Sequence, residues 1–308
     1  MSSRYLFFSL LTTLCLAVCC TKESVEFNND EQVRAIFCID QIKEGPDSKT
    51  IIDGENFVWE ASDTVGIYPN TGSQIFFAMT NGAGTNTAVF DGGGWAFKSG
   101  STYYSYLPFI PDFYLDRKLI PVTFSGQRQD GHNGTSGKMH IGNYDYMYAD
   151  PATVKNGAIS FSYHHLVAFI YCRATLGPGT YKQLTITAPS DIFTIDGYFD
   201  LTAEKPEIIS SKKDKELSIV LDNITLTEAT TFDINLTTAP VNLSGKKVVV
   251  SVLNENKEQF DCEKEIKREY SAGNRYGLAC SDWKKVEQSV TVLVDDWQEG
   301  SHTDGDLQ

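Results

Sequence analysis

AISFSYHHLVAFIYCRATL, residues 158–176, is the longest strand-like run in the chain and decides its predicted fold class. Ile159, Phe161 and Tyr163 alternate with polar residues, as on a strand that buries one face. Over residues 166–172 apolar side chains occupy both faces, which is typical of a strand covered on both sides. The stretch therefore predicts a central strand of a β-protein.

Shorter period-2 apolar runs lie on both sides of this stretch, separated by Gly, Pro, Asn and Asp, and they are typical of half-buried strands. Before the long stretch, strands are expected at residues 33–42, 64–68, 74–79, 87–90, 102–107 and 119–124. After it, strands are expected around Leu184, Leu217, Phe232, Val248, Tyr276 and Val290, and a further one within 254–270. Helical spacing is scarce, so we predict an all-β protein.

Length and composition set the domain number. At roughly 150 residues per domain, 308 residues predict about two domains after any leader is removed. The glycine-rich stretch 127–143 is expected to be an exposed loop, and we place the boundary after it, at about residue 150. Two tandem β-sandwich domains follow, at 32–150 and 151–297, with a polar tail at 298–308.

The N-terminus has the pattern of an export signal. Residues 5–18 are uncharged, follow Arg4, and are too short to span a bilayer. The run ends at Cys19 and Cys20 and then becomes polar, as in a bacterial lipoprotein signal. We predict a signal peptide at 1–19, lipid attachment at Cys20 and a linker at 20–31; lipidation at Cys19 and an ordinary signal peptide are the alternatives. The chain is therefore expected to leave the cytoplasm.

Charge and motifs exclude several function classes. The chain has 26 Lys and Arg against 40 Asp and Glu, a net charge of −14, which disfavours nucleic acid as a partner. His164 and His165 are adjacent and would point to opposite faces of a strand, so they cannot chelate one metal ion together. Nucleophile-elbow, zincin and phosphate-loop motifs are absent from the sequence. We expect no catalytic residues, no metal and no cofactor; a glycosidase carboxylate pair is the third-ranked alternative.

Four cysteines follow the leader: Cys38, Cys172, Cys262 and Cys280. Their spacing matches neither a zinc site nor a thioredoxin-type motif, so most are expected to be core thiols. An exported chain can also oxidise them, and three complete connectivities are then open.

An ordered set of short motifs covers nearly the whole chain. It comprises the lipoprotein cysteine, FVWE at 57–60, SDTVGIY at 62–68, YYSYLP at 103–108, Gln127, DYMYA at 145–149, FSYHHL at 161–166, AGNRY at 272–276 and DW at 296–297. In this order the motifs resemble the fimbrillin family, the fimbrial subunit-like lipoproteins of type V pili in Gram-negative anaerobes.

The resemblance implies a surface-exposed lipoprotein of the outer membrane with two sandwich domains of transthyretin-like topology. Assembly with other fimbrial subunits by strand addition is implied as well. It also implies that polymerising members lose an N-terminal strand to a trypsin-like protease. By analogy the removable strand is 33–42, with Val33, Ala35, Phe37 and Ile39 on one face, and cleavage falls between Lys43 and Lys49.

The sequence departs from that pattern in two places. The loop between Lys43 and Lys49 contains no arginine, and the tail after Trp297 has no apolar donor strand. These departures favour a tip, anchor or accessory subunit over a stalk subunit. A monomeric surface lipoprotein that binds a glycan or a host protein without polymerising is the alternative, since fold does not fix function.

Overall fold

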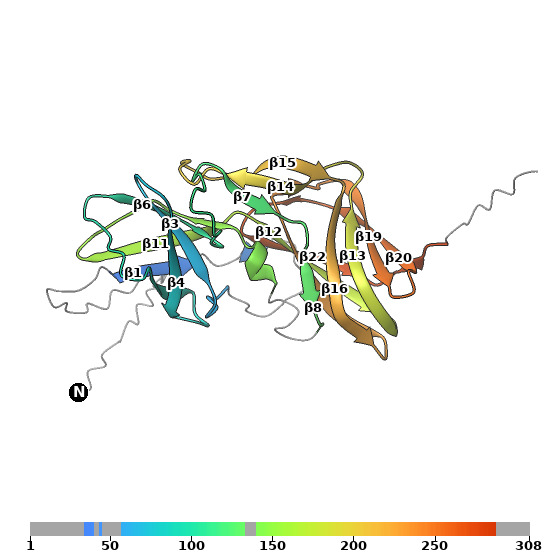
Figure 1. Cartoon of the computed structure of the whole chain (residues 1–308). Helices are drawn as coiled ribbons and strands as arrows, with labels where there is room; N and C mark the ends of the chain where they lie inside the picture. The colour runs from blue at the N-terminus through green and yellow to red at the C-terminus, as the bar shows by residue number, and fades with distance from the viewer. Residues whose placement is uncertain (1–33, 40–42, 45–56, 133–139, 288–308) are drawn as a thin grey trace, which may run out of the picture. The chain divides into compact units, whose positions relative to one another are not determined.

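The computed structural model describes residues 34–39, 43–44, 57–132 and 140–287. The predicted signal peptide, Cys20, the linker, Lys49, the strand at Val290 and the polar tail lie outside these residues. The described elements are strands, apart from the short 3₁₀ helix η1 (Ile141–Tyr144), so the all-β prediction is confirmed (Figure 1). All described residues belong to one compact unit, residues 33–308.

Seven strands close into a barrel. They run in the order β6-β3-β4-β5-β1-β11-β9, and pairing of β9 with β6 closes the ring, with the short β10 adding to β6. The strands are β1 (Arg34–Ile39), β3 (Thr64–Pro69), β4 (Ile75–Asn81), β5 (Thr87–Asp91), β6 (Thr102–Leu107), β9 (Met147–Ala149), β10 (Ala152–Thr153) and β11 (Ala158–His165). Closure removes free sheet edges, so this half is a barrel rather than the open sandwich that we predicted.

Two further sheets share one buried core. The four-stranded sheet β17-β12-β22-β2 contains β2 (Lys43–Glu44), β12 (Ala168–Leu176), β17 (Thr230–Thr238) and β22 (Asn274–Cys280). The six-stranded sheet β23-β20-β19-β13-β16-β8 contains β8 (Arg128–Asp130), β13 (Gly179–Thr187), β16 (Glu216–Leu226), β19 (Lys246–Asn254), β20 (Gln259–Ile266) and β23 (Lys284–Lys285). Side chains such as Ile234 from the first sheet and Val250 from the second join one cluster, which is how a β-sandwich packs.

Two small sheets complete the described fold. One is β15-β14-β7, formed by β7 (Ile120–Thr123), β14 (Phe193–Phe199) and β15 (Ile209–Asp214). The other pairs β18 (Val241–Asn242) with β21 (Glu269–Tyr270). The predicted strand within 254–270 is confirmed as β20 and β21. Transthyretin-like topology stays a prediction for each half.

The stretch 158–176 forms two strands, so the prediction of one long strand is wrong, whereas the predicted central strand buried on both faces is confirmed for β12, which lies between β17 and β22. β11 ends at His165 in the barrel, and β12 starts at Ala168 in the sandwich. Leu166 and Val167 between them are buried, and their backbones bond to Tyr146 and Gly273. The run is apolar on both faces here because the chain passes from one core to the next.

Strand pairing crosses the predicted boundary at residue 150. β11 pairs with β1 and β9 in the barrel, whereas β7 and β8 pair with β14 and β16 of the later sequence. The division at residue 150 stays a prediction, and hydrogen bonds connect the sequence on its two sides.

Candidate functional site

The N-terminal strand β1 is an integral part of the barrel wall. It pairs parallel with β11 over its whole length and antiparallel with β5. Ala35, Phe37 and Ile39 are buried, whereas Ile36 between them is exposed, so the predicted alternation along this strand is confirmed. A strand placed between two others satisfies both of its edges with backbone hydrogen bonds.

Phe37 is the main anchor of β1. Its ring is fully buried and lies 4.4 Å from the ring of Phe90 and 5.1 Å from that of Phe161, between centroids. Trp59, also fully buried, packs edge-on against Phe90 and Tyr163 on the other side. Burying a Phe or Ile side chain contributes about 1.5–3 kcal/mol, so β1 is held in the barrel by its apolar face as well as by its backbone hydrogen bonds.

The same N-terminal segment continues to the sandwich. β2 pairs parallel with the start of β22, through Lys43 with Asn274 and Glu44 with Arg275. Beyond that pairing, Tyr276–Cys280 have a described strand partner on one side only, which is β12. Among the described residues, β22 therefore presents the open edge of this sheet.

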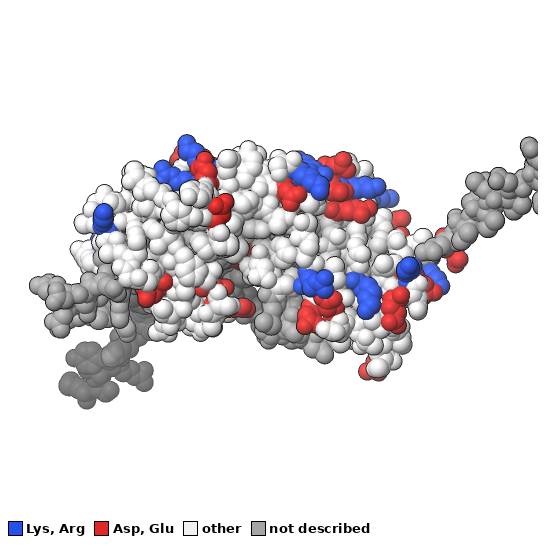
Figure 2. Space-filling view, in the orientation of Figure 1, with Lys and Arg blue, Asp and Glu red and all other residues white. Residues whose placement is uncertain are grey.

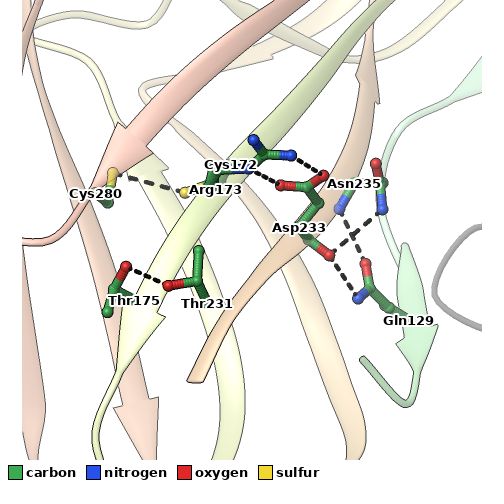
Figure 3. A network of polar contacts seen from close by, with 8 residues as sticks. All are labelled: Gln129, Cys172, Arg173, Thr175, Thr231, Asp233, Asn235 and Cys280. Carbon is green, nitrogen blue, oxygen red and sulfur yellow. Dashed lines mark hydrogen bonds and ion pairs between the residues drawn. The ribbon is translucent and has the colours of Figure 1, made fainter. Parts of the chain in front are cut away.

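The opposite edge of the sheet, at β17, is closed by side chains. The amide of Gln127 accepts a hydrogen bond from the Thr237 N–H at 2.8 Å and donates to the Thr237 carbonyl at 2.9 Å. Gln129 repeats the arrangement: it accepts from the Asn235 N–H at 2.9 Å and donates to the Asp233 carbonyl at 3.1 Å (Figure 3). Both glutamines have no exposed surface. Their amide groups take the place of a neighbouring strand.

His140 completes this cap. Its Nε2 lies 2.8 Å from the Asn235 carbonyl oxygen, and burial lowers the pKa of the imidazole. A neutral imidazole that donates from Nε2 satisfies that carbonyl. Asp233 of β17 also makes a bidentate ion pair with Arg173 of β12, at 2.9 and 3.1 Å (Figure 3). We refer to Gln127, Gln129 and His140 as the β17 cap.

The sequence analysis missed this cap. The stretch 127–143 was expected to be exposed loop, but its first part forms β8 and buries both glutamines, so that prediction is wrong there. Gln127 and Gln129 do alternate with charged residues at period 2. That signal is polar, and a search for apolar periodicity does not register it.

The structure separates the two histidines as expected. The His165 Nδ1 contacts the Asp145 carboxylate at 2.8 Å, and both side chains are buried. The His164 Nε2 lies 3.1 Å from Asp150 on a partly exposed surface. Within residues 57–132 and 140–287 plus the two short N-terminal strands, we find no cluster of three or more His, Cys, Asp or Glu that could hold a metal ion.

The structure describes four cysteines, of which Cys172, Cys262 and Cys280 are free thiols. Cys172, Cys262 and Cys280 are buried in the sandwich core, which agrees with the prediction for most of them, whereas Cys38 is partly exposed on β1. The sulfurs of Cys172 and Cys280 lie 3.6 Å apart on neighbouring strands (Figure 3). Of the helices in the described parts, none has the length and apolar character to cross a bilayer.

A closed barrel, a sandwich with one capped edge and one edge that is open among the described residues, and an N-terminal segment that pairs with both define a class of all-β proteins. The chain belongs to the fimbrillin-like family, whose model matches residues 50–297. No curated protein matches it.

The chain is similar to several solved structures, the first of which supports the fold. A candidate cell adhesion protein from Bacteroides ovatus is 14% identical, with a TM-score of 0.54 over 86% of this chain and 99% of that one. The fimbrial anchor protein Mfa2 from Porphyromonas gingivalis is 10% identical, with a TM-score of 0.35 over 76% of this chain and 82% of that one. The tip fimbrial protein Mfa3 from the same organism is 10% identical, with a TM-score of 0.37 over 83% and 99%.

Proposed function

We propose that this protein is a fimbrial subunit or fimbrillin-like surface adhesin, at a tip, anchor or accessory position, that joins other subunits by donor-strand exchange. The observation that carries the proposal is the pairing of the segment β1–β2. Its parallel partners, β11 and β22, come from distant parts of the sequence. An equivalent strand from another copy could make the same backbone hydrogen bonds and place an apolar side chain where Phe37 now lies.

Two features of the segment support exchange. β1 supplies affinity through backbone bonds on both edges, and its alternating buried side chains supply specificity. The open edge of β22 could accept more strand than the two residues of β2 now occupy. Cleavage between Lys43 and Lys49 would release β1, and we propose these lysines as the processing sites.

The proposed location follows from the N-terminus. Lipidation at Cys20 would anchor the chain in the outer membrane, since several acyl chains together give stable attachment. Domains at 32–150 and 151–297 with transthyretin-like topology are part of the same proposal. We assign the protein no catalytic activity.

The test is an immunoblot of surface material sheared from native cells and loaded without boiling. A ladder of bands, absent after boiling, is the expected result for strand-exchanged polymers. The Lys43→Ala/Lys49→Ala variant should lose the ladder if processing at these residues releases β1, and Lys155→Ala is the matched control. A single band in every lane would refute polymerisation.

The alternative is a monomeric lipoprotein that binds a glycan or host protein. Exposed aromatic rings at Phe76, Phe113 and Tyr114 favour it, because large exposed apolar surfaces on soluble proteins often mark binding sites. The single-band outcome above, with the protein retained in the membrane fraction, would favour this alternative.

A further inference from the structure

A pocket of about 820 Å³ lies on the outside of the barrel beside β4. Its three walls are β4 itself, the turn after β5 and the loop that follows β6. The lining residues are Gln74, Ile75, Phe76, Ala78, Thr80, Asp91, Gly92, Gly93, Phe109, Pro111, Asp112 and Phe113. This volume is in the range of small-molecule sites, so the pocket has ample room for one long side chain.

The loop wall is held by buried polar groups. The Gln74 Nε2 donates to the carbonyls of Ile110 and Asp112, at 2.8 and 2.5 Å, and its Oε1 accepts from the Tyr106 hydroxyl at 2.6 Å. The Tyr106 oxygen in turn accepts from the Ile110 N–H at 3.1 Å. Gly66 makes room for this ring, since a Cβ there would lie 2.2 Å from it. The loop is therefore fixed before any ligand binds.

The turn wall is fixed as well. A Cβ on Gly92 would lie 2.6 Å from the Phe77 ring, so the backbone can approach β4 only with glycine here. One oxygen of Asp91 accepts the Gly93 N–H at 3.0 Å. Both carboxylates at the pocket, Asp91 and Asp112, are on exposed residues.

The pocket combines aromatic surface with negative charge. Phe76 is 47% exposed and Phe113 is 65% exposed, and the Phe76 ring packs edge-on against Phe109 at 5.0 Å. None of the lining residues is basic. Over residues 57–115 the sequence has four acidic residues and one basic residue, Lys98. On the face drawn in Figure 2, few basic side chains lie over the barrel, and more lie over β15 and over the sandwich sheets.

We propose that this pocket binds a lysine or arginine side chain presented by a partner protein. The phenyl rings would pack on the aliphatic stem and attract the cation through their faces, and the two carboxylates would neutralise its charge. The inference rests on the proposed adhesin function and names the chemistry of its partner. It does not require strand exchange, because none of the lining residues lies in β1, β2 or β22.

The test measures binding of the peptide (Gly-Arg)₅ to the immobilised full-length chain by biolayer interferometry. The Asp91→Asn/Asp112→Asn variant keeps the side-chain shape and should weaken binding about tenfold. Phe76→Ser/Phe113→Ser keeps the charge and should also weaken it about tenfold. The charge-matched control, Asp191→Asn/Glu228→Gln, removes two acids elsewhere and should change the affinity less than twofold.

Three results would overturn the proposal. The first is equal binding by the Asp91→Asn/Asp112→Asn variant and by the unmodified chain. The second is equal binding of (Gly-Arg)₅ and (Gly-Gln)₅. The third is binding of methyl glucoside or sialic acid at this pocket without binding of (Gly-Arg)₅, which would assign it to a glycan. A surface ladder that persists in the Asp91→Asn/Asp112→Asn variant separates this failure from failure of the assembly proposal.

Discussion

The two edges of the four-stranded sheet differ in the hydrogen bonds that their outward backbone groups make. At the β17 edge, Gln127 and Gln129 bond to outward backbone groups, and neither side chain is exposed. At the β22 edge, only Asn274 and Arg275 have a described partner on the outer side. One edge is closed to further strands, and the other is available among the described residues.

This difference indicates where a strand could add. An exposed edge is a template for pairing with another chain, and proteins usually block such edges. Here the blocking groups are buried amides at one edge, whereas the other edge is occupied by a two-residue strand from the chain's own N-terminal segment. Strand addition at β22 alone would give each subunit a single acceptor edge on this sheet.

The largest effect is expected from removal of the β17 cap. In Gln127→Leu/Gln129→Leu, the N–H groups of Thr237 and Asn235 lose these acceptors in a buried setting. Each lost acceptor costs about 1–3 kcal/mol, so the free energy of unfolding should fall by about 2–6 kcal/mol. Urea unfolding at pH 7 measures this change.

The matched control is Gln183→Leu, because that side chain bonds only to Thr185 on its own strand. It should change stability by less than 1 kcal/mol. If the free energy of unfolding of Gln127→Leu/Gln129→Leu changed by as little, the cap would contribute little to stability. The two edges would then not differ in the way described.

A smaller effect is expected in hydrogen exchange of the unmodified chain. The Thr237 and Asn235 amides should exchange at least about tenfold more slowly than the outward-facing amides of Tyr276–Cys280, since exchange requires the hydrogen bond to open. In Gln129→Leu the protection of Asn235 alone should fall. Equal protection at both edges would mean that β22 is also covered.

The pH dependence of the cap follows from His140. Burial lowers its pKa, so the unfolded state takes up the proton first as the pH falls below about 6.5. The contribution of neutral His140 to the free energy of unfolding is full above that pH. It is lost as the pH falls through the lower pKa that His140 has in the folded state.

Asp63 acts in the opposite sense, because burial raises the pKa of its carboxyl to about 6 and stability is lost as the pH rises through that value.

His140→Gln isolates the histidine. A glutamine can still donate to the Asn235 carbonyl but does not titrate, so the loss of stability between pH 7 and 5.5 should be smaller in this variant. His132→Gln is the control, since that ring packs on Phe232 outside the cap. An unchanged pH profile in His140→Gln would exclude His140 as the titrating group.

Most strands were predictable because they bury one face. The expected strands at 64–68, 87–90 and 102–107 match β3, β5 and β6 to within a residue at each end. Barrel closure was not predictable, because it depends on pairing of β9 with β6 and of β1 with β11, between residues far apart in sequence. Apolar periodicity gives the face of a strand but does not identify its neighbour.

The candidate site was predictable only in part. The alternation of Ala35, Phe37 and Ile39 indicated the buried face of β1 from the sequence. The β17 cap could not be found in the same way, because buried glutamines are rare and the meaning of Gln127 and Gln129 depends on the backbone groups opposite them. The same limit applies to 158–176, where apolar periodicity did not show that one strand ends at His165 and another begins at Ala168.

The smallest effect is expected for the ion pair on β17. Arg173 and Asp233 contact through two bonds, with side chains 32% and 17% exposed, so solvent screens the attraction. A double-mutant cycle with Arg173→Met and Asp233→Asn should give a coupling energy of about 0.5–1 kcal/mol. The ion pair uses the Asp233 carboxylate, whereas Gln129 of the cap bonds to the Asp233 carbonyl, so the two interactions meet at one residue through separate groups. Their coupling energy should therefore be small, about 0.5–1 kcal/mol. A coupling energy above 2 kcal/mol, or strong coupling to Gln129→Leu, would mean that the edge is held by one network and not by the cap alone.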